Sequence, residues 1–358
     1  MFMNRNISDI YENLSKTKEL GKKCTLLIGA GCSVKAGIPL ASDFVDIIED
    51  YYPNAYKRAK EKTYPMCMAE LPFGHRRDLI ANYIDNSKIN WAHVCIALLI
   101  HEGYVDRVLT TNFDPLLIRA CALLNEFPAV YDFAVSHLFK PADVADKAIF
   151  HLHGQRGGFV LLNTEEECNM LSDHLKPVFQ DSEQGHMWIV IGYSGENDPV
   201  FDRLVEIKRF DYGLYWIGYK DSEPSEHLMK HLLIEGKDAY FVKGYDADSF
   251  FIQLTQKLKI FPPDFIARPF THMDNCFEMI IPFTLFKEEH ESDVTHESRE
   301  QIKKCMDKYE KIPSAIQEAD VLLLKGDYGG VVKMHALYDE TPSPEFADVL
   351  SWGYIGQG

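Results

Sequence analysis

The sequence has eight cysteines but no pair at the C-x-x-C spacing that structural zinc sites use. Several of these cysteines stand inside apolar runs, where cysteine usually acts as a small hydrophobic residue. The pattern suits a reducing compartment better than an oxidising one. We therefore expect a cytoplasmic protein without a bound metal.

The sequence also lacks any apolar run as long as a membrane span, and its first 23 residues lack the apolar core of a signal peptide. Its net charge of −17 argues against a nucleic-acid surface, because phosphate contacts need clustered Lys and Arg. We expect neither membrane insertion nor direct nucleic-acid binding. The hydrophobic fraction of 46% and the charged fraction of 25% are typical of a globular protein.

Short apolar segments alternate with segments of helical periodicity up to about residue 260. The predicted strands are 24–28, 105–109, 148–152, 187–192, 214–219 and 239–243. This alternation predicts an α/β fold, a Rossmann-like doubly wound parallel sheet covered by helices on both faces. Residues 42–102 are mostly helical and predict an inserted helical subdomain, broken near Pro53, Pro65 and Pro72.

The prolines at 262, 263 and 269 predict a domain boundary, with one domain over 1–265 and a helical segment over 270–358. Residues 319–332 resemble one tetratricopeptide-type helix–turn–helix unit. Such units need about three or more repeats to bury their apolar faces. Either the natural protein is longer, or this tail packs on the main domain or on a partner. We expect oligomerisation or binding of a partner protein through 270–358.

The most informative stretch is 26–39, in which an apolar run enters a turn with glycines at 29 and 31. Glycine lets the backbone bend sharply and approach a ligand closely. A strand, a glycine turn and a helix in succession place a diphosphate on exposed N–H groups. The dehydrogenase fingerprint G-x-G-x-x-G is incomplete, because position 34 is Val34, and no P-loop is present.

Three further turns follow predicted strands. They are Thr111-Asn112-Phe113-Asp114, His153-Gly154 and Gly192-Tyr193-Ser194. The carboxyl ends of parallel strands share one edge of a sheet, so the four turns are predicted to converge on one crevice.

Together these motifs resemble those of sirtuins. Residues 29–39 read Gly-Ala-Gly-x-Ser-x-x-Ala-Gly-Ile-Pro and are similar to the opening motif of that family. Residues 111–114 resemble its Gln-Asn-Ile-Asp element, 152–154 its Leu-His-Gly with the catalytic histidine, and 192–194 its Gly-Thr-Ser loop. The motifs occur in the family's order over about 24–260.

Two departures refine the resemblance. Sirtuin deacylases continue with Asp-Phe-Arg after Ile-Pro, whereas Leu40 and Ala41 follow Pro39 here, and only Cys168 stands where their four-cysteine zinc module would begin. The chain looks more like the sirtuin-like domains of bacterial defence proteins, which consume NAD and often carry helical-repeat extensions. The resemblance implies a regulated antiviral NAD+ glycohydrolase, with NAD+ as substrate and nicotinamide and ADP-ribose as products.

Asn112 and His153 are the candidate catalytic residues. The Asn112 amide can hold a ribose hydroxyl or aim a water molecule, and an imidazole with a pKa near ~6.5 can accept a proton at neutral pH. The residues expected to bind the cofactor are Gly29, Ala30, Gly31, Ser33, Thr111, Asp114, Gly192, Tyr193 and Ser194.

Each assignment has a structural alternative. Asp114 either holds the nicotinamide amide or orders the turn, and Tyr193 either stacks on the nucleotide or packs in the core. Asp198 is interpreted as a helix cap and His151 as a strand residue that only imitates His153. Three other histidines, at positions 93, 101 and 137, are interpreted as structural or surface residues. Two other functions stay open: a module that senses NAD or ADP-ribose without turnover, and an NAD-dependent protein deacylase.

Overall fold

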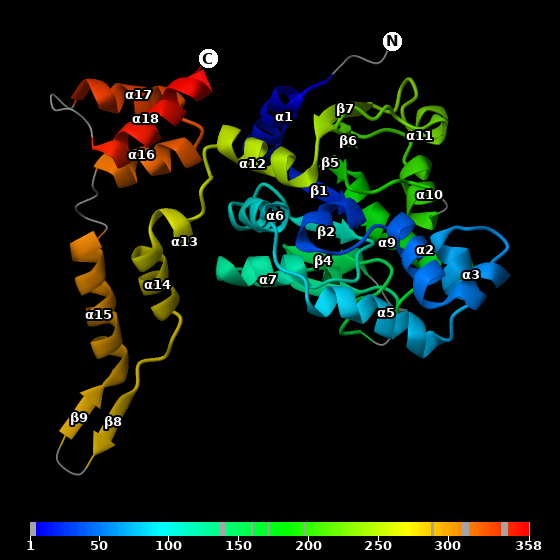
Figure 1. The fold of residues 1–358 in the computed structure, drawn as a ribbon, viewed down its shortest axis with the longest axis horizontal. Coiled ribbons are helices and arrows are strands. Elements are labelled where there is room, and N and C mark those ends of the chain that lie inside the picture. Colours follow the sequence, from blue (N-terminus) through cyan, green and yellow to red (C-terminus); the bar gives the residue numbers. More distant parts are fainter. Residues whose placement is uncertain are drawn as a thin grey trace. The chain divides into compact units, whose positions relative to one another are not determined.

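The computed structural model describes residues 5–135, 140–158, 160–170, 172–196, 198–287, 290–309, 315–337 and 343–357. His137 lies outside these ranges. The chain divides into two compact units (Figure 1). The first unit comprises Met1–Ala122 and Glu126–Leu254, and the second comprises Leu123–Asn125 and Thr255–Gly358.

The first unit is built on a seven-stranded sheet in the order β3-β4-β2-β1-β5-β6-β7, in which all neighbouring strands are parallel. The strands are β1 (Lys23–Ile28), β2 (Arg107–Thr110), β3 (Ala129–Asp132), β4 (Ala148–His151), β5 (His186–Ile191), β6 (Leu214–Tyr219) and β7 (Ala239–Tyr245). Every predicted strand is present, and the parallel sheet is confirmed. The sequence did not indicate β3, a short edge strand that is only partly buried.

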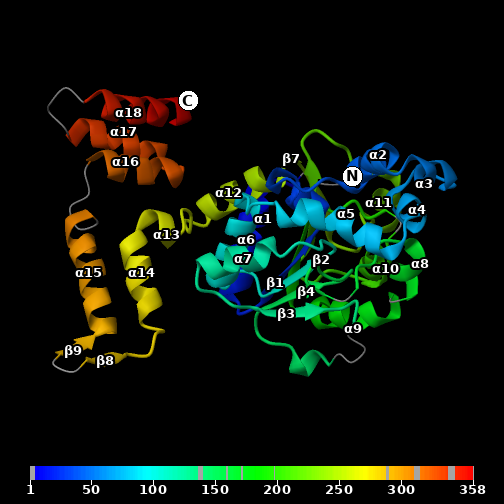
Figure 2. The same cartoon turned by 60° about the horizontal axis from the view of Figure 1, so that its bottom comes forward.

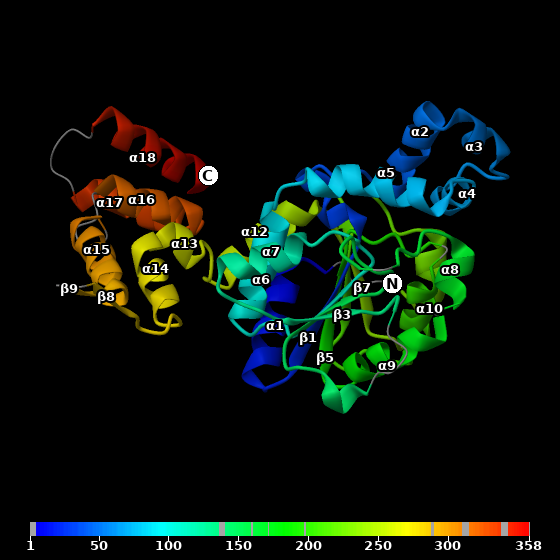
Figure 3. The same ribbon diagram turned by 90° about the horizontal axis from the view of Figure 1, so that it is seen from below.

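Helices cover both faces of this sheet. The helices described up to residue 257 are α1 (Ile7–Glu19), α2 (Ala41–Tyr51), α3 (Pro53–Arg58), α4 (Tyr64–Ala69), α5 (Phe73–Asp85), α6 (Trp91–His101), α7 (Leu116–Leu123), α8 (Glu165–Met170), α9 (Ser172–Glu183), α10 (Pro199–Glu206), α11 (Glu226–His231) and α12 (Ala247–Lys257). Figures 2 and 3 show α1, α6, α7 and α12 on one face, and α9 and α10 on the other. In the part of the chain that the structure describes, no helix has the length and apolar character needed to cross a membrane.

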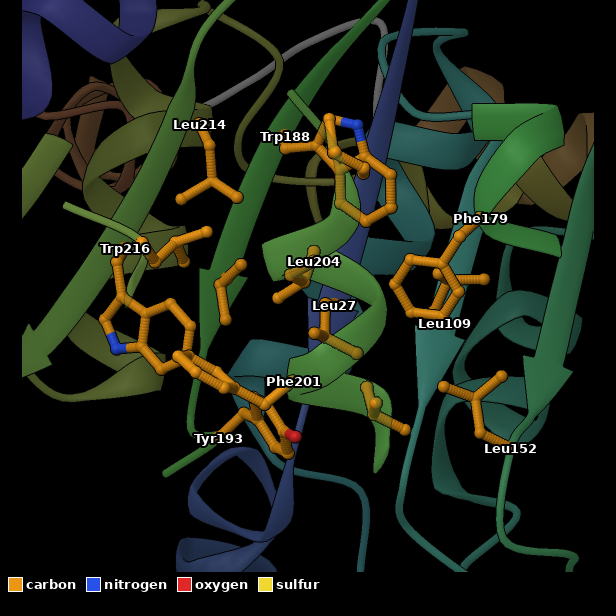
Figure 4. Close-up of a cluster of buried hydrophobic side chains, with 14 of the residues drawn as sticks. Leu27, Leu109, Leu152, Phe179, Trp188, Tyr193, Phe201, Leu204, Leu214 and Trp216 are labelled. Atoms are coloured by element: carbon orange, nitrogen blue, oxygen red, sulfur yellow. The ribbon is translucent and has the colours of Figure 1, made fainter. Parts of the chain in front are cut away.

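The central strands are buried on both faces, as expected for a doubly wound sheet. All residues of β2, β4 and β5 are buried. Figure 4 shows the core between the sheet and α9 and α10, where Trp188 stacks on Phe179 with ring centroids 5.8 Å apart. Burying aromatic side chains of this size is a major source of folding free energy. The core holds the strand ends, and therefore the loops that follow them, in fixed positions.

The predicted helical insertion has its own core of apolar residues from α2 to α5. Its predicted breaks are present, because Pro53 begins α3, Pro65 lies in the first turn of α4 and Pro72 precedes α5. Proline suits such positions, where the missing N–H group costs nothing. Helix α6 differs from the prediction: residues 92–100 are all buried, so this helix belongs to the layer that covers the sheet.

The second unit is mainly helical and contains a small hairpin that the sequence did not indicate. Its elements are α13 (Asp264–Ala267), α14 (Pro269–Phe277), β8 (Thr284–Lys287), β9 (His290–Asp293), α15 (Val294–Tyr309), α16 (Ala315–Leu324), α17 (Tyr328–Leu337) and α18 (Pro344–Gln357). The helix–turn–helix expected over 319–332 is present as α16 and α17, joined at Gly326 with φ of 69°. Helix α18 adds Phe346 and Leu350 to their apolar core.

Candidate functional site

The neighbouring strands β1 and β5 lie where the direction of chain winding reverses. From β1 the chain continues to β2 and β4 on one side, and then returns to β5 on the other side. In open parallel sheets, ligands bind in the crevice beyond the carboxyl ends of the strands at such a point. The loop that begins at Gly29 follows β1, and the loop that begins at Gly192 follows β5. Both predicted nucleotide loops therefore start at this switch point.

Glycines allow these two loops to touch backbone to backbone. A Cβ atom on Gly29 would lie 2.5 Å from the carbonyl oxygen of Gly192, and one on Gly31 would lie 2.7 Å from the Gly192 Cα. Gly192 itself has φ of 68°, and its Cβ would lie 2.6 Å from the Cys32 nitrogen. The three glycines are thus required by the packing of the protein itself, apart from any ligand.

The amides of the first loop are mostly engaged. The Gly29 and Gly31 N–H groups donate to the carbonyls of Ile191 and Gly192 at 3.1 and 2.9 Å. The Cys32 and Ser33 N–H groups close the short 3₁₀ turn over Ala30–Cys32. In this conformation the four N–H groups donate within the protein, and diphosphate binding by the loop stays a prediction.

A buried network joins this loop to the turn after β2. The Ser33 hydroxyl donates to Asp114 Oδ2 at 2.9 Å and accepts from Asn112 Nδ2 at 3.1 Å. The same Nδ2 donates to the Gly29 carbonyl at 3.1 Å. An asparagine side chain has two hydrogens on its nitrogen, so both are used here, and Oδ1 is the atom left to accept from a ligand. The network fixes the orientation of the Asn112 amide.

Asp114 has the structural role that was one of its two interpretations. Its Oδ1 accepts from the Leu116 N–H at 3.1 Å, at the start of α7, while Oδ2 accepts from Ser33. An aspartate side chain that accepts from the N–H group two positions later in the chain orders the turn. It also satisfies an N–H group that has no partner within the helix. Both carboxylate oxygens of Asp114 are therefore engaged, and its contact with nicotinamide stays a prediction.

Two buried histidines flank the network. His151 Nδ1 lies 2.9 Å from the carbonyl oxygen of Asn112, and His93 Nε2 lies 3.4 Å from the Ser33 hydroxyl. Burial lowers the pKa of both imidazoles, and the nearby Asp114 carboxylate opposes this effect only in part. Both rings are therefore neutral at physiological pH. His93 is buried beside Ser33, a candidate binding residue, and His151 is in direct contact with Asn112, a candidate catalytic residue.

His153 forms an ion pair with Asp198. The distance from Nε2 to Oδ1 is 3.3 Å, and the two side chains are 14% and 12% exposed. Burial alone would lower the pKa of His153, but the Asp198 carboxylate and the Cys168 thiol outweigh it and raise this pKa to about 10. His153 is therefore an imidazolium at neutral pH in this pairing, in place of the neutral base that its ordinary pKa suggested.

Asp198 also caps α10, as the sequence predicted, by accepting from the Val200 N–H at 2.9 Å. Burial opposes ionisation of this carboxyl, but the His153 cation lowers its pKa below the ordinary value. His153 follows β4 and Asp198 follows β5, and in the sheet these two strands are separated by β2 and β1. The ion pair therefore reaches across the carboxyl ends of the strands that carry Gly29 and Asn112.

The other predicted binding residues occupy different environments. Tyr193 packs in the core, where it is 9% exposed and its ring centroid lies 5.8 Å from that of Trp216 (Figure 4), and its contact with the nucleotide stays a prediction. Thr111 is half-buried and its N–H donates to the Ile28 carbonyl, whereas Ser194 is exposed. Ala30 is half-buried in the first loop. Within the ranges described, no three His, Cys, Asp or Glu side chains are grouped so that they could hold a metal ion.

Residues 106–238 match the family model of the SIR2-like domain. The matched segment begins at β2, ends before β7 and contains Asn112, His153, Gly192 and Asp198. The resemblance to sirtuins that the motifs indicated is confirmed over this segment. None of the curated proteins matches the chain.

Solved structures that match the chain include sirtuins. A Sir2 homologue in complex with NAD is 16% identical, and the match covers 72% of this chain and 96% of that one with a TM-score of 0.46. A Sir2 homologue mutant in complex with ADP-ribose is also 16% identical, with 76% and 98% covered and a TM-score of 0.44.

The sequence did not indicate three contacts: His153 with Asp198, His151 with Asn112, and His93 with Ser33. It indicated Asp198 as a cap, but nothing in the spacing indicated that the carboxylate also meets His153. The position of His151 carried a usable signal. A residue at the carboxyl end of a parallel strand lies beside the turns that follow the neighbouring strands. His93 stands within the apolar helix α6 and carried no signal, since only the fold brings it beside Ser33.

Proposed function

We propose that this chain is an NAD+ glycohydrolase that cleaves NAD+ to nicotinamide and ADP-ribose. The observation that carries the proposal is the fixed amide of Asn112. Its two hydrogens are donated to Gly29 and Ser33 in the loop at the switch point, and its Oδ1 accepts no hydrogen bond from the residues that the structure describes. Asn112 itself lies in the SIR2-like segment. NAD+ is the substrate that the sirtuin-like motifs imply.

The proposed reaction asks little of the protein. The bond between ribose C1′ and the nicotinamide nitrogen breaks, and its electron pair leaves with nicotinamide, which is thereby neutral. The ribose passes through an oxocarbenium-like state, which water attacks at C1′. Most of the catalysis comes from holding the ribose in the reactive orientation. The rest comes from a group that accepts a hydrogen bond from the ribose hydroxyl or from the attacking water. Asn112 Oδ1 is assigned that acceptor role.

His153 is assigned the role of a cationic hydrogen-bond donor to the ribose or its hydroxyls. The pairing with Asp198 holds the proton on the ring. Water that has attacked an oxocarbenium carbon is strongly acidic and loses its proton to solvent, so the reaction does not require a neutral histidine. His153 is thus proposed as a hydrogen-bond donor, in place of the general base that the sequence suggested.

We further propose a regulated effector of antiviral defence that acts by NAD depletion in the cytoplasm. This proposal comes from the resemblance of the motifs to sirtuin-like defence domains. Unrestrained loss of NAD would kill the host, so control through oligomerisation or a partner protein is expected. The helical segment 270–358, which contains the helix–turn–helix of tetratricopeptide type, is proposed as the contact region.

The decisive assay incubates the whole chain of residues 1–358 with NAD+ and separates the products by chromatography. Equal amounts of nicotinamide and ADP-ribose support the proposal. A parallel reaction with an acetylated peptide tests protein deacylation, for which O-acetyl-ADP-ribose is the diagnostic product. Tight calorimetric binding of NAD+ without turnover, in every oligomeric fraction of the protein, would instead identify a sensing module.

A further inference from the structure

In the hydrogen bond between His151 and the backbone of Asn112, the donor and the acceptor can be assigned. A carbonyl oxygen can only accept, so the hydrogen in the 2.9 Å contact belongs to Nδ1 of His151. Nε2 is buried and has no hydrogen-bond partner among the described residues. The neutral ring, 2% exposed, is therefore held as the Nδ1–H tautomer. A buried histidine with one defined donor is suited to positioning.

Hydrogen bonds join Asn112 to three parts of the sheet: β2, β4 and the loop after β1. Its own N–H donates to Thr110 Oγ1 at 3.0 Å, in β2. Its side chain donates to the loop after β1, through Gly29 and Ser33. Of these hydrogen bonds, only the one to His151 comes from β4, where His151 is the last residue of the strand.

Strand β4 also leads to His153, two residues after His151. Only Leu152 lies between His151 and His153, so a displacement of the Asn112 peptide from His151 changes the separation between the two candidate catalytic residues. A misplacement of about 1 Å of a catalytic group can cost ~10²-fold in rate. His151 thus couples the Asn112 side to the His153 side of the site.

We propose that His151 is a positioning residue: its Nδ1–H donor fixes the Asn112 peptide, and with it Oδ1, relative to β4 and His153. The inference rests on the proposed NAD+ hydrolysis, which it deepens. The ring does not touch the substrate and does not exchange protons during the reaction. It differs in this from His153, and from the sequence-based interpretation of His151 as an imitation of His153.

Two substitutions of nearly equal polarity separate positioning from packing. The side-chain nitrogen of asparagine takes the place of imidazole Nδ1, whereas that of glutamine reaches the place of Nε2. His151→Asn is expected to keep kcat for nicotinamide release within about 3-fold of the wild type. His151→Gln is expected to lose kcat by roughly 10- to 100-fold with KM for NAD+ little changed.

The unfolding midpoint of both variants is measured as the control. A packing role predicts that kcat follows the loss of volume and stability, so that both variants fall together, and this outcome would overturn the proposal. Retention of kcat by His151→Gln would overturn it as well. If the residue acts through Asn112, His151→Gln adds no further loss in an Asn112→Ala background.

A second measurement does not depend on activity. The ¹⁵N chemical shifts of the His151 ring in the free protein distinguish a protonated Nδ1 from a protonated Nε2. Protonation at Nδ1 is expected, and protonation at Nε2 contradicts the positioning contact. A wild-type protein that leaves NAD+ intact would refute the proposed function, while the tautomer would still decide the geometry on which the inference rests.

Discussion

The His153 ring and the Asp198 carboxylate meet at 3.3 Å, between Nε2 and Oδ1, although their loops leave strands that are not neighbours in the sheet. The carboxylate stabilises the imidazolium form and also caps α10. One aspartate therefore fixes the charge of a candidate catalytic histidine and the start of the helix beside it. This relationship makes the pH dependence of the protein a direct test of the site.

Replacing Asp198 with asparagine is predicted to shift the pH profile of the reaction. In the wild type, the working form of His153 is protonated, so activity persists through neutral pH and falls as pH rises through about 10. The introduced asparagine would still cap α10, since asparagine is among the best caps, but it would leave burial as the main influence on the ring. The fall in nicotinamide release is then expected near or below neutral pH. An unchanged profile would contradict the role of the ion pair.

The same ion pair is predicted to contribute to stability in a defined pH window. The pKa of His153 in the folded protein is raised above its ordinary value of 6.5. Its contribution is therefore fully present below about pH 6.5 and is lost as pH rises through about 10. Chemical denaturation at pH 6 should show Asp198→Asn less stable than the wild type, and the difference should shrink at pH 10.5. A difference that grows with pH would contradict this sign.

Gly192→Ala is predicted to destabilise the protein through the contact between the loops after β1 and β5. The residue has φ of 68°, and an added Cβ would lie 2.6 Å from the Cys32 nitrogen. Strain and overpacking of this kind cost about 1–3 kcal/mol of the free energy of unfolding. Gly74→Ala in α5 is the matched control, because nothing lies within 4 Å of its added Cβ. Equal effects of the two substitutions would refute the packing argument.

Asp106→Asn is predicted to stabilise the protein above neutral pH. Burial raises the pKa of this carboxyl to about 6, although Arg107 and Lys23 lie 3.3 and 3.5 Å away, and neither oxygen has a hydrogen-bond partner among the described residues. The charged form is therefore disfavoured in the fold, and its cost appears as pH rises through about 6. Unfolding at pH 8 should require on the order of 1 kcal/mol more for the variant, with no difference near pH 4. A loss of stability at pH 8 would show that the ion pairs outweigh burial.

Self-association through the second unit is predicted from its exposed apolar side chains. Within residues 281–286, Ile281 is 85% exposed, Phe283 61% and Phe286 73%. Large exposed apolar residues gathered in one segment mark interaction surfaces. Sedimentation of the full chain should show an oligomer, and Ile281→Asp with Phe286→Asp should dissociate it and reduce NAD+ cleavage. A fully active monomer would contradict this contact region.

Much of the fold followed from periodicity, whereas the site followed only in part. Buried parallel strands such as β5 are continuous apolar runs, so the sequence indicated them directly. The edge strand β3 and the hairpin of β8 and β9 are short and partly polar, and local pattern does not separate them from loops. The expected parallel sheet predicted that the four turns share one edge. The network of Ser33, Asn112 and Asp114 connects two of these turns.

The sequence did not indicate the protonation state or the hydrogen-bond partners of the polar groups in the site. The ordinary pKa of histidine suggested a base at His153, but charge and burial around the ring come from residues distant in the chain. The glycines at 29 and 31 suggested an open cradle of amides, whereas those amides donate to the chain near β5. Such contacts depend on three-dimensional packing and leave no mark on spacing.

The most direct test of the account is the rate of nicotinamide release from NAD+ by the full chain, compared with Asn112→Ala and His153→Ala. The wild type is expected to release nicotinamide and ADP-ribose in equal amounts. Each variant is expected to lose activity by at least about 100-fold, since each substitution removes an interaction with the reacting ribose or water. Calorimetric binding of NAD+ and the unfolding midpoint serve as controls for folding. Activity that survives both substitutions would contradict the assignment of the site.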